Sequence, residues 1–151
     1  MNRLHIALAA GVSVALLGGA YVFEYLGYAP CRMCYWQRWP HMAAIAIGVL
    51  ALLVPARVLG YAGALAALTT AAIGLFHTGV ERGWWEGPSS CTGGGGLAEL
   101  SGADLLSTEG SRLIMCDQVS WELFSLSMAS WNMVFSLGAM VLWLVAARAR
   151  S

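Results

Sequence analysis

Four long apolar segments constrain the fold of this 151-residue chain more than any other feature, at about residues 4–23, 37–55, 58–78 and 129–147. A helix that spans a bilayer needs about 20 mostly apolar residues. Only 11% of the residues are charged, against about 25% in soluble domains. We therefore expect an all-α membrane protein. Residues 1–151 should form a single membrane domain, a bundle of four transmembrane helices.

The segment between the third and fourth helices, about residues 79–128, is the one long stretch outside the membrane. Glycines fill positions 93–96, and glycine restricts the backbone least. We expect a mostly irregular loop that acts as a tethered arm, with a short helix near residues 98–107. Aromatic residues of the loop, such as Trp84 and Trp121, suit the bilayer surface. The sequence shows no strand pattern.

Charge predicts the topology. The net charge is zero with no lysine, which argues against a nucleic-acid partner. Arginines lie at the two termini and in the connection between the second and third segments: Arg3, Arg57, Arg148 and Arg150. All carboxylates lie in or beside the other two connections: Glu24, Glu81, Glu86, Glu99, Asp104, Glu109, Asp117 and Glu122. Basic ends are cytoplasmic, so both termini should be cytoplasmic and all four cysteines outside, on the side that is oxidising in bacteria.

The first segment has some features of a cleavable signal peptide. Arg3 precedes an apolar run, and small residues occupy positions 18–20. The run is longer than a usual signal core. We expect it to stay as the first helix, because cleavage would leave three helices to shelter the cysteines.

A Cys-x-x-Cys pair, Cys31 and Cys34, lies where the second helix begins. This spacing suits a redox-active dithiol. Read as a helix, Arg38 and His41 follow Cys34 at i+4 and i+7, on the same face. A helix N-terminus and a nearby cation favour the thiolate. A metal-binding pair and two inert cysteines remain alternatives at this point.

Cys91 and Cys116 are the other two cysteines, on either side of the glycine-rich stretch. In an oxidising compartment, two such residues often form a structural disulfide. Beside a membrane-surface dithiol, a disulfide can instead exchange with it through a mixed disulfide. The two pairs in series would then form an electron relay.

A relay needs a final electron acceptor. No nucleotide-binding glycine motif or pair of haem-ligating histidines is present. A quinone dissolved in the bilayer fits better. Arg38 could stabilise charge that develops on its oxygens, although an arginine near the membrane surface can simply extend to the headgroups. His77 could donate a hydrogen bond or carry a proton. His41 should lie deeper.

In this order, the segments and motifs resemble the DsbB family of bacterial thiol:quinone oxidoreductases. The resemblance rests on four apolar segments, the motif Cys31-Arg-Met-Cys34-Tyr-Trp-Gln-Arg38, a histidine near the end of the third segment, and a cysteine pair in the second external loop. It covers nearly the whole chain and implies an enzyme of the bacterial inner membrane, with its cysteines on the periplasmic side, that reoxidises a periplasmic DsbA-type dithiol oxidase.

The resemblance also implies residue roles. Cys91 would form the mixed disulfide with the DsbA-like partner, and Cys116 would leave as a thiol. Electrons would pass to Cys31 and Cys34, with Cys34 engaging the quinone. Arg38 and His77 would lie beside the quinone, most simply ubiquinone, with menaquinone as the alternative. Two departures stand out: the glycine-rich loop, and Gln37 where glutamate is frequent, which removes an ion-pair partner for Arg38.

Four other functions compete with this interpretation. A DsbB-like paralogue could serve a dedicated partner. Relatives of vitamin K epoxide reductase also use four helices and two cysteine pairs, but there the loop pair comes first. A copper-handling membrane protein could bind Cu(I) through Cys31, Met33 and Cys34. A structural scaffold with a stapled loop would leave the Cys-x-x-Cys and Arg38 unexplained.

Overall fold

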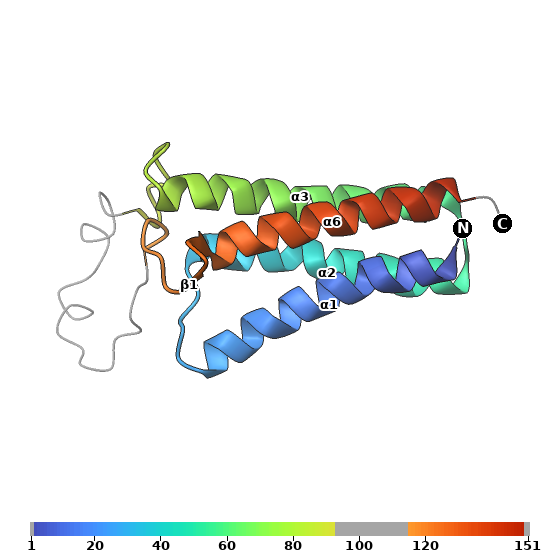
Figure 1. Ribbon diagram of the computed structural model, residues 1–151, viewed down its shortest axis with the longest axis horizontal. Helices are drawn as coiled ribbons and strands as arrows, with labels where there is room; N and C mark the ends of the chain where they lie inside the picture. The colour runs from blue at the N-terminus through green and yellow to red at the C-terminus, as the bar shows by residue number, and fades with distance from the viewer. Residues whose placement is uncertain (1, 93–114, 150–151) are drawn as a thin grey trace.

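The computed structural model describes residues 2–92 and 115–149, and within them the chain forms a bundle of four helices (Figure 1). These are α1 (Arg3–Tyr25), α2 (Arg32–Leu53), α3 (Arg57–Glu81) and α6 (Met128–Arg148). The expectation of a mostly helical protein is confirmed. The short helix expected near residues 98–107 lies outside the described residues.

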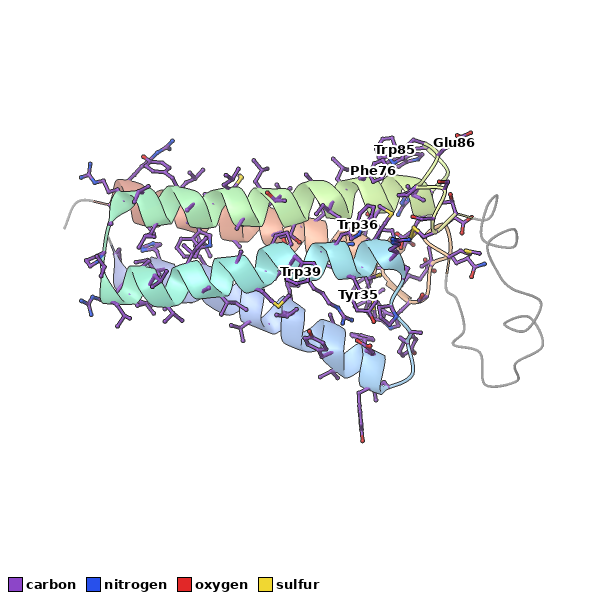
Figure 2. The ribbon with its side chains drawn as sticks, turned by 180° about the vertical axis from the view of Figure 1, so that it is seen from behind. Tyr35, Trp36, Trp39, Phe76, Trp85 and Glu86 are labelled. Carbon is purple, nitrogen blue, oxygen red and sulfur yellow. A yellow bond between two sulfur atoms is a disulfide. The ribbon has the colours of Figure 1, made fainter. Side chains whose placement is uncertain are left out.

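Three helices are long and apolar enough to cross a membrane: α1, α3 and α6. The remaining helix, α2, contains Gln37, Arg38, Pro40 and His41 in its first half. Its length is comparable, but these polar groups reduce its apolar character. Its outward side chains include Trp36 and Trp39, both exposed (Figure 2).

Helix ends follow from local chemistry. The Cys31 Sγ caps α2 by accepting a bond from the Cys34 backbone N–H at 3.3 Å. The Ser127 hydroxyl caps α6 in the same way, by accepting from the Ser130 N–H at 3.2 Å. Such caps satisfy backbone donors that have no partner within the helix. Pro55 follows the end of α2 and directs the chain into α3.

The expectation of no strands is wrong in one place. Glu122–Leu123 (β1) and Leu126–Ser127 (β2) pair as a two-stranded antiparallel hairpin just before α6. The turn residues Phe124 and Ser125 have φ values of 53° and 60°. Two residues per strand are too few for an alternating pattern, so no sequence period could reveal this hairpin.

The end of α3 is held to the following loop by Trp85. Its ring stacks on Phe76 with centroids 5.9 Å apart, and its Nε1 donates to the Phe76 carbonyl oxygen at 2.8 Å (Figure 2). Gly79 lies under the same ring, where a Cβ atom would clash. These contacts fix the start of the segment that carries Cys91.

Small residues bring the helices together away from the cysteines. Trp143 of α6 is fully buried in a cluster made mostly of alanines. Small residues let helix backbones approach closely, as is typical of membrane bundles. Towards its C-terminal end, α1 diverges from the other helices (Figure 1). This divergence leaves room for the cavity described below.

Gly63 should be essential to this packing. A Cβ atom at Gly63 would lie 2.5 Å from the nearest ring atoms of Trp143. We expect Gly63→Ala to destabilise the bundle by about 1–3 kcal/mol through overpacking. Thermal unfolding in detergent, followed by tryptophan fluorescence, measures the effect. Gly138→Ala on α6 is the control, because in the part of the chain that the structure describes no atom beyond its own stretch of helix lies within 4 Å of the added Cβ. Equal unfolding temperatures for both variants would contradict the role of Gly63.

Candidate functional site

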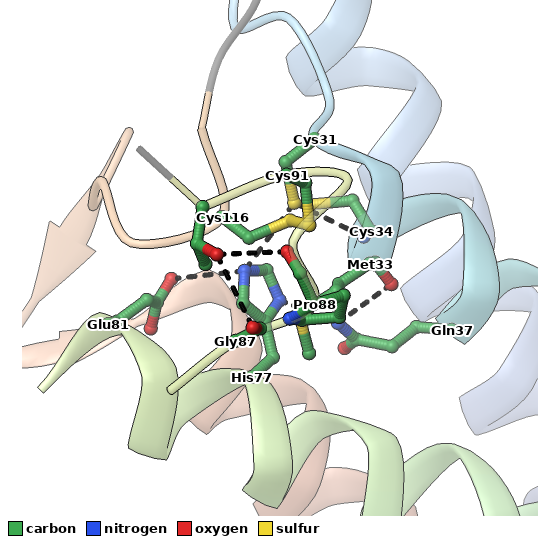
Figure 3. Close-up of a disulfide and its surroundings, with 11 residues drawn as sticks. Cys31, Met33, Cys34, Gln37, His77, Glu81, Gly87, Pro88, Cys91 and Cys116 are labelled. Atoms are coloured by element: carbon green, nitrogen blue, oxygen red, sulfur yellow. Dashed lines mark hydrogen bonds and ion pairs between the residues drawn. A yellow bond between two sulfur atoms is a disulfide. The ribbon is translucent and has the colours of Figure 1, made fainter. Parts of the chain in front are cut away.

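The structure brings the two cysteine pairs into one buried cluster. Cys91 and Cys116 form a disulfide, whereas Cys31 and Cys34 are free with their sulfurs 2.9 Å apart (Figure 3). The cluster also contains Met33 and Val80, and Cys34 packs against it. A backbone bond from the Cys116 N–H to the Cys91 oxygen closes the loop beside the disulfide. Proximity of the two pairs is what thiol–disulfide exchange requires.

Cys31 lies at the N-cap of α2, where several hydrogen-bond donors point at its sulfur. A hydrogen bond from the Cys34 thiol, together with one from His77, holds the pKa of the Cys31 thiol well below its ordinary value, although burial opposes the shift. The Cys34 backbone N–H also points at this sulfur. The thiolate is the reactive form in exchange, so the geometry favours a reactive Cys31.

Cys31 is expected to be mainly thiolate at neutral pH. A depressed pKa means that the thiolate persists as pH falls and is lost only at acidic pH, whereas an ordinary cysteine is only a few per cent thiolate at about pH 7. The ultraviolet thiolate absorbance of a reduced Cys91→Ala/Cys116→Ala variant, minus that of the same protein with Cys31→Ser, measures this titration. His77→Phe should move it towards the ordinary value. A midpoint near that of free cysteine would contradict the expectation.

His77, which the sequence predicted for the site, lies against the dithiol near the end of α3. Its Nε2 atom is 3.4 Å from the Cys31 sulfur and 3.7 Å from Oε1 of Glu81. Its Nδ1 atom is 2.9 Å from Nε2 of Gln37. Sequence reasoning missed Glu81, although the i,i+4 spacing from His77 could have indicated it. It treated Gln37 only as a departure from the family pattern.

Arg38 is buried, and its guanidinium forms an ion pair with Glu24 of α1 at 2.8 Å. The rings of Tyr21 and Tyr35 lie 4.6 and 4.8 Å from the guanidinium carbon, within cation–π range. Residue 37 offers Arg38 no acidic partner, and Glu24 of α1 supplies one in its place. Nothing in the sequence could show this contact, since the two residues lie on different helices.

An apolar cavity of about 400 Å³ adjoins the dithiol. Most of its wall is apolar, and α1 and α6 supply much of the apolar part. Its polar wall residues include Cys34, Arg38 and His41, which the sequence placed on one face of a helix, together with His77. The cavity-wall residues whose side chains carry sulfur, nitrogen or a charge are Cys31, Cys34, Gln37, Arg38, His41, His77, Glu81, Gln118, Trp121, Met128, Trp131 and Asn132.

His41 lies on this cavity wall and also takes part in a hydrogen-bond network. Its Nε2 atom is 2.8 Å from Oδ1 of Asn132 and 3.2 Å from the Thr70 hydroxyl. Sequence reasoning missed both partners. Each lies on another helix, and neither is a residue type that alone signals chemistry.

Three side chains of the site could also hold a metal ion. The ligand atoms of Cys31, Cys34 and His77 all lie within 4.8 Å of one another. Thiolate and imidazole ligands suit zinc and copper. The metal alternative therefore has a physical site, and metal analysis tests it directly.

The fold and the site together define a class. A helical membrane protein that packs a disulfide against a dithiol, beside an apolar cavity, is built as a membrane-bound thiol–disulfide oxidoreductase. Residues 2–146 match the family model for disulfide bond formation protein DsbB, and the chain belongs to that family. It is therefore an oxidoreductase of disulfide formation. No curated protein and no solved structure gives a significant match.

Proposed function

We propose that this protein oxidises the dithiol of a periplasmic DsbA-like partner and passes the electrons to a membrane quinone. The observation that carries the proposal is the packing of both cysteine pairs against each other, with Cys31 and Cys34 also lining an apolar cavity. One pair can thus exchange with a protein thiol while the other faces a space suited to a hydrophobic molecule.

The first exchange involves the loop disulfide. A thiolate of the partner attacks the Cys91 sulfur, the Cys91–Cys116 bond breaks, and Cys116 leaves as a thiolate. The second partner thiolate then attacks the mixed disulfide. This step releases the oxidised partner and leaves Cys91 and Cys116 reduced. Two electrons have entered the protein.

The second exchange passes these electrons to the Cys31–Cys34 pair. A loop thiolate attacks the Cys31–Cys34 disulfide, and the loop disulfide re-forms. The products are an oxidised loop and a reduced dithiol, the same combination as in the structure. Donors around the Cys31 sulfur stabilise the thiolate that this step produces.

The cavity fits a quinone ring. Its wall is largely apolar, and the buried Nε atom of Arg38 has no hydrogen-bond partner among the described residues. A bound quinone would supply a two-electron, two-proton acceptor. Arg38 is the residue that would hold its polar atoms, His77 lines the same cavity beside the dithiol, and Cys34 is the thiol that would engage it. Ubiquinone is the first candidate and menaquinone the second.

We also propose the topology that charge predicts. α2 crosses the membrane as α1, α3 and α6 do, despite its polar first half, so that four helices span the bilayer. Both termini are cytoplasmic, and both cysteine pairs lie on the periplasmic side, with residues 79–128 as the periplasmic loop. The arginines at positions 3, 57 and 148, on the opposite ends of the helices from the cysteines, support this orientation.

The proposed function is tested with purified protein, a reduced DsbA-type partner and ubiquinone, while quinone absorbance is followed. We expect reduction of quinone that depends on both the protein and the partner. A general DsbA-type protein that fails where a partner from the same source succeeds would indicate a dedicated paralogue. If neither ubiquinone nor menaquinone is reduced with any partner, the proposal fails.

A metal-handling function is the second candidate, favoured by the Cys31, Cys34 and His77 cluster. It predicts stoichiometric zinc or copper in protein purified under reducing conditions. Metal-free protein that reduces quinone would exclude it.

A further inference from the structure

A chain of hydrogen bonds, part-buried at Asn132 and buried at His77, runs across the bundle from His41 to the dithiol. From Nε2 of His41 it passes to Oδ1 of Asn132 at 2.8 Å, and from Nδ2 of Asn132 to Oε1 of Gln37 at 2.7 Å. From Nε2 of Gln37 it continues to Nδ1 of His77 at 2.9 Å, and Nε2 of His77 then faces the Cys31 sulfur at 3.4 Å. Four helical side chains therefore connect the middle of the bundle to the reactive thiol.

Backbone carbonyls fix the direction of this chain. Nδ2 of Asn132 also points at the Thr70 carbonyl oxygen, and Nε2 of Gln37 at the Met33 carbonyl oxygen, each at 3.4 Å. A carbonyl oxygen only accepts hydrogen bonds. Each amide must therefore present its NH₂ group on that side, and turning either amide over would place two acceptors against each other.

The Thr70 hydroxyl supports the same direction. It donates to the Gln37 carbonyl oxygen at 3.2 Å, so towards Asn132 and His41 it is an acceptor. His41 then donates from Nε2 to both Thr70 and Asn132. Every donor along the chain points towards Cys31.

We propose that Gln37, oriented by Asn132, is a positioning residue that holds His77 as the neutral Nε2–H tautomer. The amide N–H of Gln37 points at Nδ1, which must therefore carry a lone pair. The ring proton of neutral His77 is then on Nε2, where it faces the Cys31 sulfur. His77 is thus a fixed hydrogen-bond donor to the Cys31 thiolate and not the base that removes its proton.

The charged groups around His77 would favour a protonated ring, against the effect of Gln37. The Cys31 thiolate and the Glu81 carboxylate both lie on the Nε2 side, Cys34 is next to Cys31, and Arg82 adjoins Glu81. The two anions would favour an imidazolium. Its second proton, however, would have to lie on Nδ1 against the Gln37 N–H, which would force the amide to turn away from both Met33 and Asn132. Each of these buried groups would then lose its partner.

This inference rests on the proposed function only for its meaning in catalysis. A donor that cannot become a base would stabilise the thiolate in each turnover, and the proton of Cys31 would have to leave by another route. The tautomer itself is a property of the protein alone, measurable without partner or quinone.

The test is a ¹⁵N spectrum of histidine-labelled full-length protein in detergent micelles, with His77 assigned by its loss in His77→Phe. We expect an unprotonated Nδ1 and a protonated Nε2 from about pH 6 to about pH 8, the range in which an ordinary imidazole titrates. A proton on Nδ1, or a doubly protonated ring at neutral pH, would overturn the proposal in the wild-type protein itself.

Two variants sharpen the result. Gln37→Glu replaces the donor at Nδ1 with an acceptor and should move a proton onto Nδ1. Gln118→Glu, which adds the same charge elsewhere on the cavity wall, should leave the tautomer unchanged. If both variants alter His77 equally, the effect is one of charge and not of orientation, and the proposal fails. A correct tautomer in protein that never reduces quinone would instead count against the proposed function alone.

Discussion

Replacing Cys34 with serine is expected to abolish quinone reduction completely while exchange with the partner through Cys91 continues. Serine cannot form the Cys31–Cys34 disulfide, so electrons can enter the loop pair but cannot pass onwards. The Cys91–Cys116 disulfide is a separate bond and remains available for attack. The measurement is quinone absorbance, together with a gel assay for the mixed disulfide between Cys91 and the partner.

Cys91→Ser is the matched variant on the other side of the relay. It should also abolish quinone reduction, but it should form no mixed disulfide through residue 91. Circular dichroism of both variants verifies that the helices remain. If Cys34→Ser reduces quinone at the wild-type rate, the two pairs do not act in series, and the relay is wrong.

Arg38→Met is expected to lower kcat/KM for quinone by about 100-fold, since the loss of one preorganised donor or charge at a reacting oxygen typically has this effect. Arg38 lines the cavity beside Cys34, and its buried Nε–H has no partner within residues 2–92 and 115–149. Exchange of the loop disulfide with the partner should be unchanged. Steady-state rates at varied quinone and varied partner concentrations separate the two effects.

The fall in kcat/KM of Arg38→Met could also have a structural cause, because the substitution breaks the ion pair with Glu24. Arg38→Met leaves the Glu24 carboxylate without its cation, and an unpaired acid can distort a site. The double variant Arg38→Met/Glu24→Gln removes both charges. It should stay as impaired as Arg38→Met if the arginine itself acts on the quinone. Recovery of wild-type activity in the double variant would mean that Arg38 only neutralises the Glu24 carboxylate and does not act on the quinone.

Much of the architecture was predictable because membrane helices must satisfy their own backbone hydrogen bonds and present apolar side chains to lipid. Apolar runs therefore marked α1, α3 and α6 closely. α2 begins earlier than its apolar run, at Arg32, because a cysteine cap and polar residues form its first turns. The β1–β2 hairpin was not predictable, since a two-residue strand leaves no period in the sequence.

For the candidate site, the sequence by itself indicated the groups that could react: Cys31, Cys34, Cys91 and Cys116, with Arg38 and His77 nearby. The chemistry of thiols, a guanidinium and an imidazole can be predicted from residue type and spacing. Only the tertiary structure decided what surrounds them. Glu24 meets Arg38, Gln37 meets His77, and Asn132 meets Gln37, because packing sets how the helices are rotated against one another. Side chains on different helices can touch only in the rotation that the whole buried core selects, and no local pattern encodes that choice.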